Sequence, residues 1–353
     1  MNFNQIRRLF IFVILSFCFV GFASAQSWIK KLRSPVFYEI GIQTAWQSNA
    51  FNASVGEVEY TATAPEYLGG VTTVSSPELV GLAKIRYEPR LWRGYKSKVR
   101  ASIFVHHFTE FSIKDFRSMS FNFEQNIGNY QSILLSFRNL PEFYLRNYLS
   151  KNATTGIASR EKCLFMEQTY TIGYAHRPFK KHRFSYELER QNVVYNAAFS
   201  QYDIGIYSMN LDWDWSKFKT LPISASLQYG KAFNLNEIDI VDRSYDNVNG
   251  RIKASLRLDL GGLESVSGKL GLDTRQYFSG DENDEIHAGR SHQEYRLEWD
   301  VNFAWDSSIK AKIYGGSRYR NVEAINVNIE DFKSFERWWL GLRLSYDFVW
   351  NVY

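Results

Sequence analysis

The chain has 353 residues, 17% of them aromatic, and its 42 basic residues nearly balance its 37 acidic ones, to a formal net charge of +5. This balance predicts neither a nucleic-acid-binding surface nor an acidic tail. The two cysteines, Cys18 and Cys163, exclude a small domain held together by several disulfides, and the length suits one large barrel better than one sandwich.

The first 25 residues have the pattern of a secretory signal peptide. Arg7 and Arg8 precede an apolar run at 9–22, and an Ala-x-Ala site ends at Ala25. The run is shorter than the roughly 20 residues that a transmembrane helix needs. We therefore expect cleavage after Ala25, with residues 26–353 forming a single exported unit.

Runs of alternating apolar and polar residues recur along the rest of the chain and predict β-strands. Between residues 249 and 260, for example, Ile252 and Leu256 share one face, and Arg251 and Lys253 share the other. Alternation alone does not show whether the apolar face meets a protein core or lipid. The runs lie near 36–46, 79–88, 98–105, 118–124, 130–137, 164–175, 183–190, 207–215, 222–231, 249–260, 265–276, 295–305, 308–319 and 338–348.

The connections between these runs alternate between long and short. Longer segments lie at 47–78, 108–116, 138–162, 191–204, 232–247, 277–292 and 320–335, and shorter ones lie at 88–97, 128–130, 176–182, 216–222, 261–265 and 306–308. Such alternation requires an even number of antiparallel strands with both termini on one side. It is typical of transmembrane barrels, which have short periplasmic turns and longer extracellular loops. We predict one all-β antiparallel transmembrane barrel of 14 strands, with 12 or 16 as the neighbouring possibilities.

The pattern resembles the porin-like outer-membrane β-barrels of Gram-negative bacteria over nearly the whole exported chain. This resemblance implies a place in the outer membrane, contact with its lipid, and recognition of the C-terminal aromatic Tyr353 by the barrel-insertion machinery. Tyr353 is odd-numbered, whereas the apolar residues of the last strand are even-numbered. Either a bulge lies near residues 348–350 or the terminal signal is weak.

The charged residues of the late strands are the predicted functional surface. If the apolar face meets lipid, these residues line the lumen, where they form either a water-filled path or a salt-bridge network that fills it. Fourteen strands lie between small filled barrels and open porins, and favour some channel. The predicted lumen residues are Arg251, Lys253, Arg257, Asp259, Lys269, Asp273, Arg275, Arg296, Glu298, Asp300, Lys310, Lys312, Arg318 and Arg343.

One long connection, at 139–156, differs from the others because it carries an apolar set. Pro141 fits the first turn of a short helix that would present Phe143, Leu145, Tyr148 and Leu149. This set could fold into the lumen as a constriction or dock against a partner. The alternative, which we favour, is a loop packed on the rim of its own barrel.

No enzymatic constellation is evident. His287 and His292 lie near several acidic residues in a long connection, where a solvated charged loop is favoured over a metal site. His106 and His107 occupy opposite faces of one strand end, and the sequence contains none of the familiar hydrolase, zinc-protease or phosphate-binding motifs. We expect no enzyme activity, no catalytic residue, no metal and no cofactor.

The sequence thus predicts an outer-membrane channel through which small solutes diffuse passively along a charged lumen. The alternative is a non-conducting barrel that acts in surface assembly, secretion or adhesion through its extracellular loops. Nucleic acid is not an expected partner, and the solute and the oligomeric state stay open.

Overall fold

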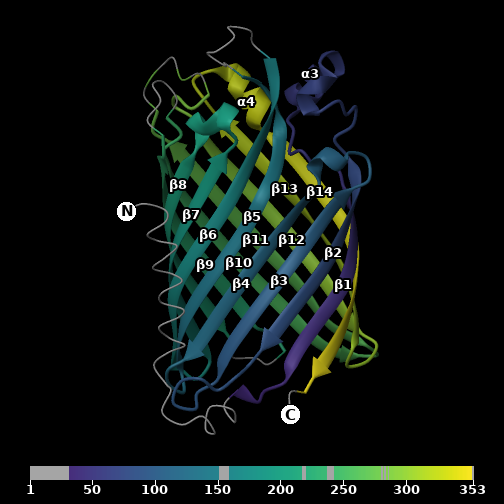
Figure 1. Ribbon diagram of the computed structural model, residues 1–353, viewed down its shortest axis with the longest axis vertical. Helices are drawn as coiled ribbons and strands as arrows, with labels where there is room; N and C mark the ends of the chain where they lie inside the picture. Colours follow the sequence, from purple (N-terminus) through teal and green to yellow (C-terminus); the bar gives the residue numbers. More distant parts are fainter. Residues whose placement is uncertain are drawn as a thin grey trace.

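The protein forms a closed antiparallel barrel of fourteen strands, as predicted (Figure 1). The computed structural model describes residues 32–150, 159–216, 220–236, 242–279, 281, 284 and 286–351. The strands are β1 (Val36–Gln47), β2 (Ser76–Tyr87), β3 (Ser97–Phe108), β4 (Phe116–Asn126), β5 (Gln131–Ser150), β6 (Ser159–Phe179), β7 (His182–Tyr195), β8 (Ile204–Trp215), β9 (Ile223–Asn234), β10 (Tyr245–Leu260), β11 (Leu263–Tyr277), β12 (Ser291–Ala304), β13 (Ile309–Glu323) and β14 (Phe335–Trp350).

Each strand pairs with its neighbours in the sequence, and β1 closes the barrel against β14. The closing ladder runs without a break from Trp339 opposite Gln47 to Trp350 opposite Val36. A closed barrel leaves no unpaired sheet edge, so each strand finds hydrogen-bond partners on both sides.

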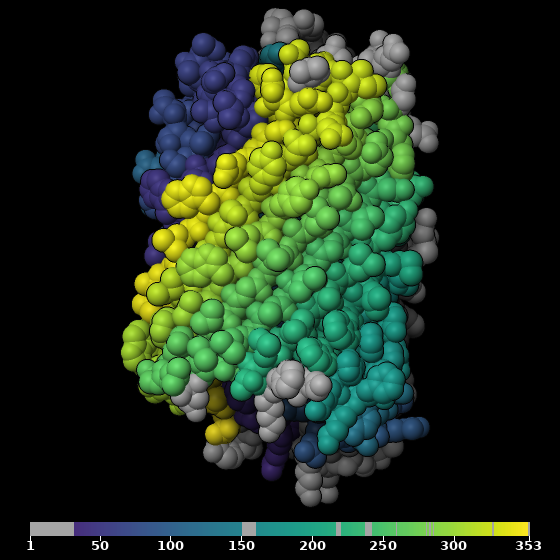
Figure 2. All heavy atoms as spheres, turned by 180° about the vertical axis from the view of Figure 1, so that it is seen from behind, coloured from purple at the N-terminus to yellow at the C-terminus, as the bar shows by residue number. Residues whose placement is uncertain are grey.

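The outer face of the barrel is apolar because the residues alternate with the pleat of each strand. On β10, Ile252 is 59% exposed and lies opposite Leu270 of β11 and Ala225 of β9. Its neighbours Arg251 and Lys253 lie on the opposite face. Figure 2 shows the late strands crossing the outer wall obliquely, from β8 in green to β14 in yellow. In the parts of the chain that are described, no helix is long and apolar enough to cross a membrane.

The two ends of the barrel differ as the loop lengths predict. At the turn end, β10 and β11 are joined by Gly261 and Gly262 alone, with φ values of 57° and 93°. Positive φ at both positions suits the tight hairpin turns that match strand twist, and glycine adopts it without strain. At the loop end lie the helices α3 (Val55–Thr63) and α4 (Val327–Lys333) and the short 3-10 turns η1 (Pro65–Leu68), η2 (Ser112–Lys114) and η3 (Ala197–Tyr202).

The predicted helix beginning at Pro141 is wrong, because β5 continues as a strand to Ser150 and pairs with β6. The ladder shifts register between Leu140 and Phe143 and again between Tyr144 and Asn147. Proline cannot donate a hydrogen bond to a ladder and is tolerated at such irregularities. The long β5–β6 hairpin therefore rises above the rest of the barrel at the loop end (Figure 1).

The last strand shows no bulge up to Trp350, so the bulge proposed near residues 348–350 is absent. Tyr353 and the predicted signal peptide, 1–25, lie outside the described residues. The roles expected of both stay predictions.

Candidate channel lumen

The inner face of the barrel encloses two adjoining cavities. One, of about 920 Å³, lies toward the turn end, and the other, of about 510 Å³, lies toward the loop end. Both are lined by Glu187, Asp212, Ser226, Arg251 and Lys269, so they share a wall. Together they extend from the β4–β5 turn to Arg243, in the β9–β10 connection.

Acidic side chains gather on one side of these cavities, on β6, β7 and β8. They are Glu167, Glu187, Glu189, Asp212 and Asp214. Arg183 bridges Asp214 and Glu124 at 3.4 and 3.7 Å, but no ion pair joins Glu187 or Asp212 to any described residue. Within this acidic wall, Glu167 lies 2.7 Å from Arg138, whereas Glu187 and Asp212 have no direct ion-pair partner among the described residues.

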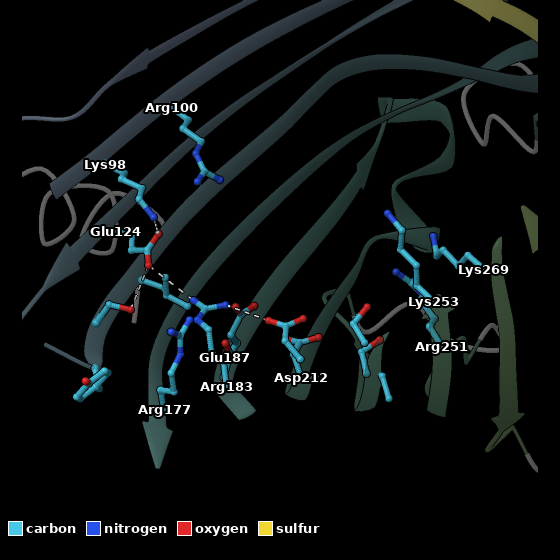
Figure 3. Close-up of a pocket in the computed structure, with 18 of the residues that line it drawn as sticks. Lys98, Arg100, Glu124, Arg177, Arg183, Glu187, Asp212, Arg251, Lys253 and Lys269 are labelled. Atoms are coloured by element: carbon cyan, nitrogen blue, oxygen red, sulfur yellow. Dashed lines mark hydrogen bonds and ion pairs between the residues drawn. The ribbon is translucent and has the colours of Figure 1, made fainter. Parts of the chain in front are cut away.

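Basic side chains gather on β10 and β11, beyond the small inward residues of β9. Arg251, Lys253 and Lys269 face the acidic wall across the cavity (Figure 3). Lys269 is held 2.8 Å from Glu298 of β12. Arg251 and Lys253 are exposed and form no ion pair with a described residue.

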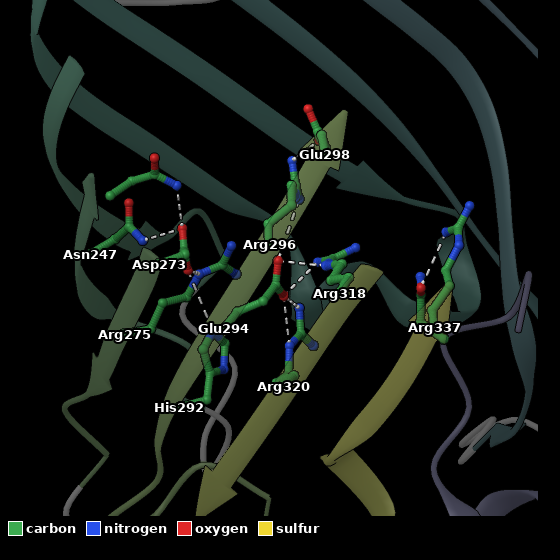
Figure 4. Close-up of polar contacts among 12 residues, drawn as sticks. Asn247, Asp273, Arg275, His292, Glu294, Arg296, Glu298, Arg318, Arg320 and Arg337 are labelled. Atoms are coloured by element: carbon green, nitrogen blue, oxygen red, sulfur yellow. Dashed lines mark hydrogen bonds and ion pairs between the residues drawn. The ribbon is translucent and has the colours of Figure 1, made fainter. Parts of the chain in front are cut away.

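Above this level, arginines converge on two carboxylates from β11 and β12 (Figure 4). Arg320 donates to one oxygen of Glu294 at 2.8 Å, and Arg318 and Arg296 lie within 2.5 and 3.4 Å of that carboxylate. The Glu294 carboxylate thus serves three guanidinium groups, and of these Arg296 also lies 3.8 Å from Glu298. Three arginines near two carboxylates leave a local excess of positive charge.

The second carboxylate, that of Asp273, is held by neutral as well as charged groups. Asn247 and Asn249 donate to it at 2.9 and 3.0 Å, and Arg275 donates to it at 3.2 Å. His292 Nε2 lies 3.7 Å away. These contacts fix the orientation of Arg275 beside the upper cavity.

The structure divides the predicted lumen residues into two groups. One group lines the cavities: Arg251, Lys253, Lys269, Asp273, Arg275, Arg296, Glu298, Asp300 and Arg318. Three others are not among the lining residues and are held in ion pairs: Lys310 with Asp347 at 2.7 Å, Lys312 with Asp300 at 3.6 Å, and Arg343 with Glu39. Arg257 is exposed near the turn end, and the side chain of Asp259 is outside the described set.

At the loop end lies a cluster of side chains centred on Glu57 of α3, which is 1% exposed. Arg146 of β5 donates to Glu57 at 2.5 Å, and the Tyr67 hydroxyl donates to its other oxygen at 2.8 Å. Lys333 of α4 lies 3.8 Å from Glu57 and 5.9 Å from the Tyr148 ring centre. We call these five residues the loop-end cluster.

The loop-end cluster spans the mouth of the barrel, because β13, which leads into α4, and β5 lie on roughly opposite sides of the ring of strands. Of the apolar set predicted at 143–149, Tyr148 packs edge-on against Tyr67 and Phe199, and Phe143 packs against Phe116 and Phe165. Leu145 is partly buried, and Leu149 is 59% exposed. A buried contact of loops therefore narrows the lumen at this end.

The four histidines considered in the sequence analysis lie beside separate carboxylates, and that of His292 is Asp273. His287 Nδ1 lies 2.9 Å from Asp284, and burial lowers the His287 pKa although Asp284 opposes this effect. His106 lies 2.7 Å from Glu78, and His107 lies 2.7 Å from Asp115. Within the described residues, no group of His, Cys, Asp and Glu is arranged to hold a metal ion.

Sequence reasoning did not single out the acidic wall or the loop-end cluster. Glu187 and Glu189 alternate with Leu188, and Asp212 alternates with Trp213, so the period-two signal was present in strands already predicted. Glu57 had no comparable signal, because it lies in a long connection without strand periodicity.

A closed barrel with an apolar outer face and a polar interior is the architecture of outer-membrane β-barrels, and this chain has that architecture. Its place is accordingly the cell outer membrane. No protein-family model and no curated protein matches the sequence.

Solved structures with a similar fold include the outer membrane channel DcaP of Acinetobacter baumannii, which shares 9% identity over 93% of this chain and 99% of that chain, with a TM-score of 0.46. A bacterial polysaccharide outer membrane secretin shares 9% identity over 88% of this chain and 98% of its own, with a TM-score of 0.42. An anion-selective porin from Comamonas acidovorans shares 11% identity over 89% of this chain and 98% of its own, with a TM-score of 0.39. Because these identities and TM-scores are low, the assignment to the outer-membrane β-barrels is based on the architecture of the barrel and not on these similarities.

Proposed function

We propose that the protein is a passive outer-membrane channel for small polar solutes, and that its inward charged residues line the path. The observation that carries this proposal is the pair of adjoining cavities of about 920 and 510 Å³, lined by exposed charges. A barrel filled by its own salt bridges would pair these charges, yet Arg251, Lys253, Glu187 and Asp212 have no ion-pair partner among the described residues.

The solute would cross between the turn end, which faces the periplasm in this class, and the loop end, which faces outside. The narrow part is the loop-end cluster, where Tyr148 meets η1, η3 and α4. Loop contacts at the mouth limit solute size, and the charges below them act on what has entered.

Conductance of the purified, refolded protein in a planar lipid bilayer tests this proposal. We expect steady open steps in the wild type and a larger step in Glu57→Gln, because Arg146 and Lys333 would lose their shared partner. Heat-modifiable mobility on gels first establishes that each sample is a folded barrel. Silence of both folded proteins at high density in the bilayer would contradict the channel.

The second candidate is a non-conducting barrel that acts through its loops in surface assembly, secretion or adhesion. It is favoured by one observation: the loop-end cluster joins α3, η1, β5 and α4 into a packed surface around a buried carboxylate. Wild-type silence together with binding of cells or surface polymers that depends on the loops would support it.

A further inference from the structure

A trough with opposite charges on its two banks runs along the inner face of β9. Its floor consists of the inward residues Ser224, Ser226, Gln228 and Gly230 of β9. Its acidic bank consists of Glu187, Glu189 and Asp212, and its basic bank consists of Arg251 and Lys253. We call this feature the β9 trough.

The strand register sets the width of the trough. Asp212 of β8 lies opposite Ser226 of β9, and Ser226 lies opposite Arg251 of β10. Two strand spacings of about 4.8 Å therefore separate the backbones of Asp212 and Arg251, roughly 10 Å in all. The side chain of Ser226, between them, is too short to form a hydrogen-bonded bridge from the Asp212 carboxylate to the Arg251 guanidinium group.

The charges of the two banks are accessible, and no direct ion pair joins one bank to the other, although Arg251 attracts Asp212 and Glu189 at longer range. Arg251 and Lys253 are exposed, and Glu187 and Asp212 are partly exposed. Glu189 accepts one hydrogen bond, from Gln228 at 3.4 Å. Elsewhere in the lumen, opposite charges on adjacent strands do meet, as Lys269 and Glu298 do at 2.8 Å. The separation across β9 thus leaves a site for a solute that carries both charges.

We infer that the β9 trough binds small zwitterions whose ammonium and carboxylate groups are separated by several ångströms. The ammonium group would lie against Asp212 and Glu187, and the carboxylate against Arg251 and Lys253. The serine hydroxyls and the Gln228 amide of the floor offer hydrogen bonds to polar groups between the two ends. This inference rests on the proposed channel for its physiological meaning, but the binding itself can be measured without transport.

The charges of the two banks favour a zwitterion over an ion of one sign. A dianion would bring its second negative charge onto the acidic bank, and a dication would bring its second positive charge onto the basic bank. Both would be repelled, because like charges repel. A compact zwitterion such as free glycine cannot reach both banks. Charge separation in the solute is therefore the property that the trough selects.

The test is a ligand-observed NMR titration of the folded, detergent-solubilised full-length protein. The probes are ε-aminocaproate, glycine, adipate, hexamethylenediamine and hexanediol. Glycine is a shorter zwitterion than ε-aminocaproate, and the other three are similar to it in length but carry two negative charges, two positive charges or none. We expect ε-aminocaproate to bind at least about five-fold more tightly than each of the others. Equal affinity for all probes would overturn the inference.

Variants locate the binding to the trough. Asp212→Asn and Arg251→Gln should each weaken ε-aminocaproate binding by about five-fold, and Asp212→Asn should not weaken adipate binding. The matched controls are Lys310→Gln and Asp347→Asn, which remove the same charges outside both cavities and should leave the affinity unchanged. An equal loss in the controls would place the binding elsewhere and overturn the inference.

The outcomes separate this inference from the proposed function. Conductance without selective binding would leave the channel and remove the zwitterion site. Selective binding without conductance would leave the site and remove the channel. Failure of both measurements on a heat-modifiable, folded protein would overturn both.

Discussion

The loop end and the middle of the lumen contain the same kinds of charged side chains in opposite circumstances. At the loop end, Glu57 and Arg146 are 1% and 8% exposed and lie 2.5 Å apart. In the middle of the lumen, Arg251 and Lys253 are exposed and have no ion-pair partner among the described residues. Burial therefore decides what a charge does here.

A buried charge that loses its partner is costly, because neither water nor protein compensates it. A lumen charge keeps its water, so its removal costs the fold little and changes instead what the lumen attracts. The loop-end cluster should accordingly control stability and access, whereas the β9 trough should control selection.

The largest effect is expected for Glu57→Gln. Glutamine can keep the capping box with Ser54 at the start of α3, so the change isolates the lost charge. Arg146 would stay buried without its carboxylate, at a cost of about 3–5 kcal/mol. Urea unfolding of the refolded barrel, followed by tryptophan fluorescence, measures this loss.

The control for this prediction is the double variant Glu57→Gln with Arg146→Met, which removes both charges. It should recover most of the lost free energy of unfolding, since no unpaired charge is left behind. Equal stability of the wild type and Glu57→Gln would contradict the assigned role of the loop-end cluster.

The next largest effect compares the outer and inner faces of one strand. Ile252→Arg would place a charge on the outer, lipid-facing surface of β10 and cost about 2–4 kcal/mol near the bilayer midplane. Asn249→Arg would place the same charge on the inner face, beside Asp273, which Asn249 contacts at 3.0 Å. Only the first should reduce folding yield in lipid vesicles, and equal losses in both variants would argue against the assigned faces.

The strands and their number could be predicted from the sequence because period-two alternation is local and each run carries it independently. The segment after Pro141 was misread, because spacing suggested a short helix where pairing with β6 produces a strand. The β5–β6 ladder shifts register next to Pro141, and a proline fits such an irregularity as well as it fits the first turn of a helix, so the local sequence did not decide between them.

The candidate site was only half predictable for a related reason. Arg251 and Lys253 were identified as inward residues from alternation alone, and Glu187 and Asp212 could have been identified in the same way. Their role as two separated groups of opposite charge depends on β9, which lies between them and places Ser226 opposite both Asp212 and Arg251. This arrangement follows from the strand pairing and not from the alternation within any one strand. The burial of Glu57 depends on contacts with the β13–β14 connection and with the part of β5 beyond Pro141, and the sequence did not predict either contact.

A smaller effect tests whether the loop end is dry. Lys114 of η2 is 2% exposed, donates to the Tyr144 carbonyl at 2.7 Å and lies 4.3 Å from the Phe143 ring centre. Burial, with Arg146 and Arg337 nearby, lowers the Lys114 pKa well below 10.5. Between the lowered pKa and 10.5, the unfolded chain binds more protons than the folded one, so stability rises with pH.

The slope that Lys114 contributes in this range approaches about 1.4 kcal/mol per pH unit. Below the lowered pKa, Lys114 is protonated in both the folded and the unfolded state. The slope then vanishes, and the destabilisation by the buried charge stays constant. Urea unfolding at a series of pH values, kept below the titration of the tyrosines, measures the slope. Lys114→Met should remove it, and identical slopes in the two proteins would show that Lys114 is hydrated.

The smallest effect is expected for an ordinary ion pair on the inner face of the barrel, outside both cavities. Lys310 and Asp347 lie 2.7 Å apart on adjacent strands, with side chains 43% and 32% exposed. Water screens such a pair, so a double-mutant cycle with Lys310→Gln and Asp347→Asn should give a coupling of about 0.2–1 kcal/mol. A second double-mutant cycle, on Glu57 and Arg146, gives the coupling energy of a buried pair. The two coupling energies together show how burial changes the strength of an ion pair. A coupling as large as that of the loop-end cluster would mean that the lumen is as dry as its mouth, and the separated charges of the β9 trough could not then act through water on a passing solute.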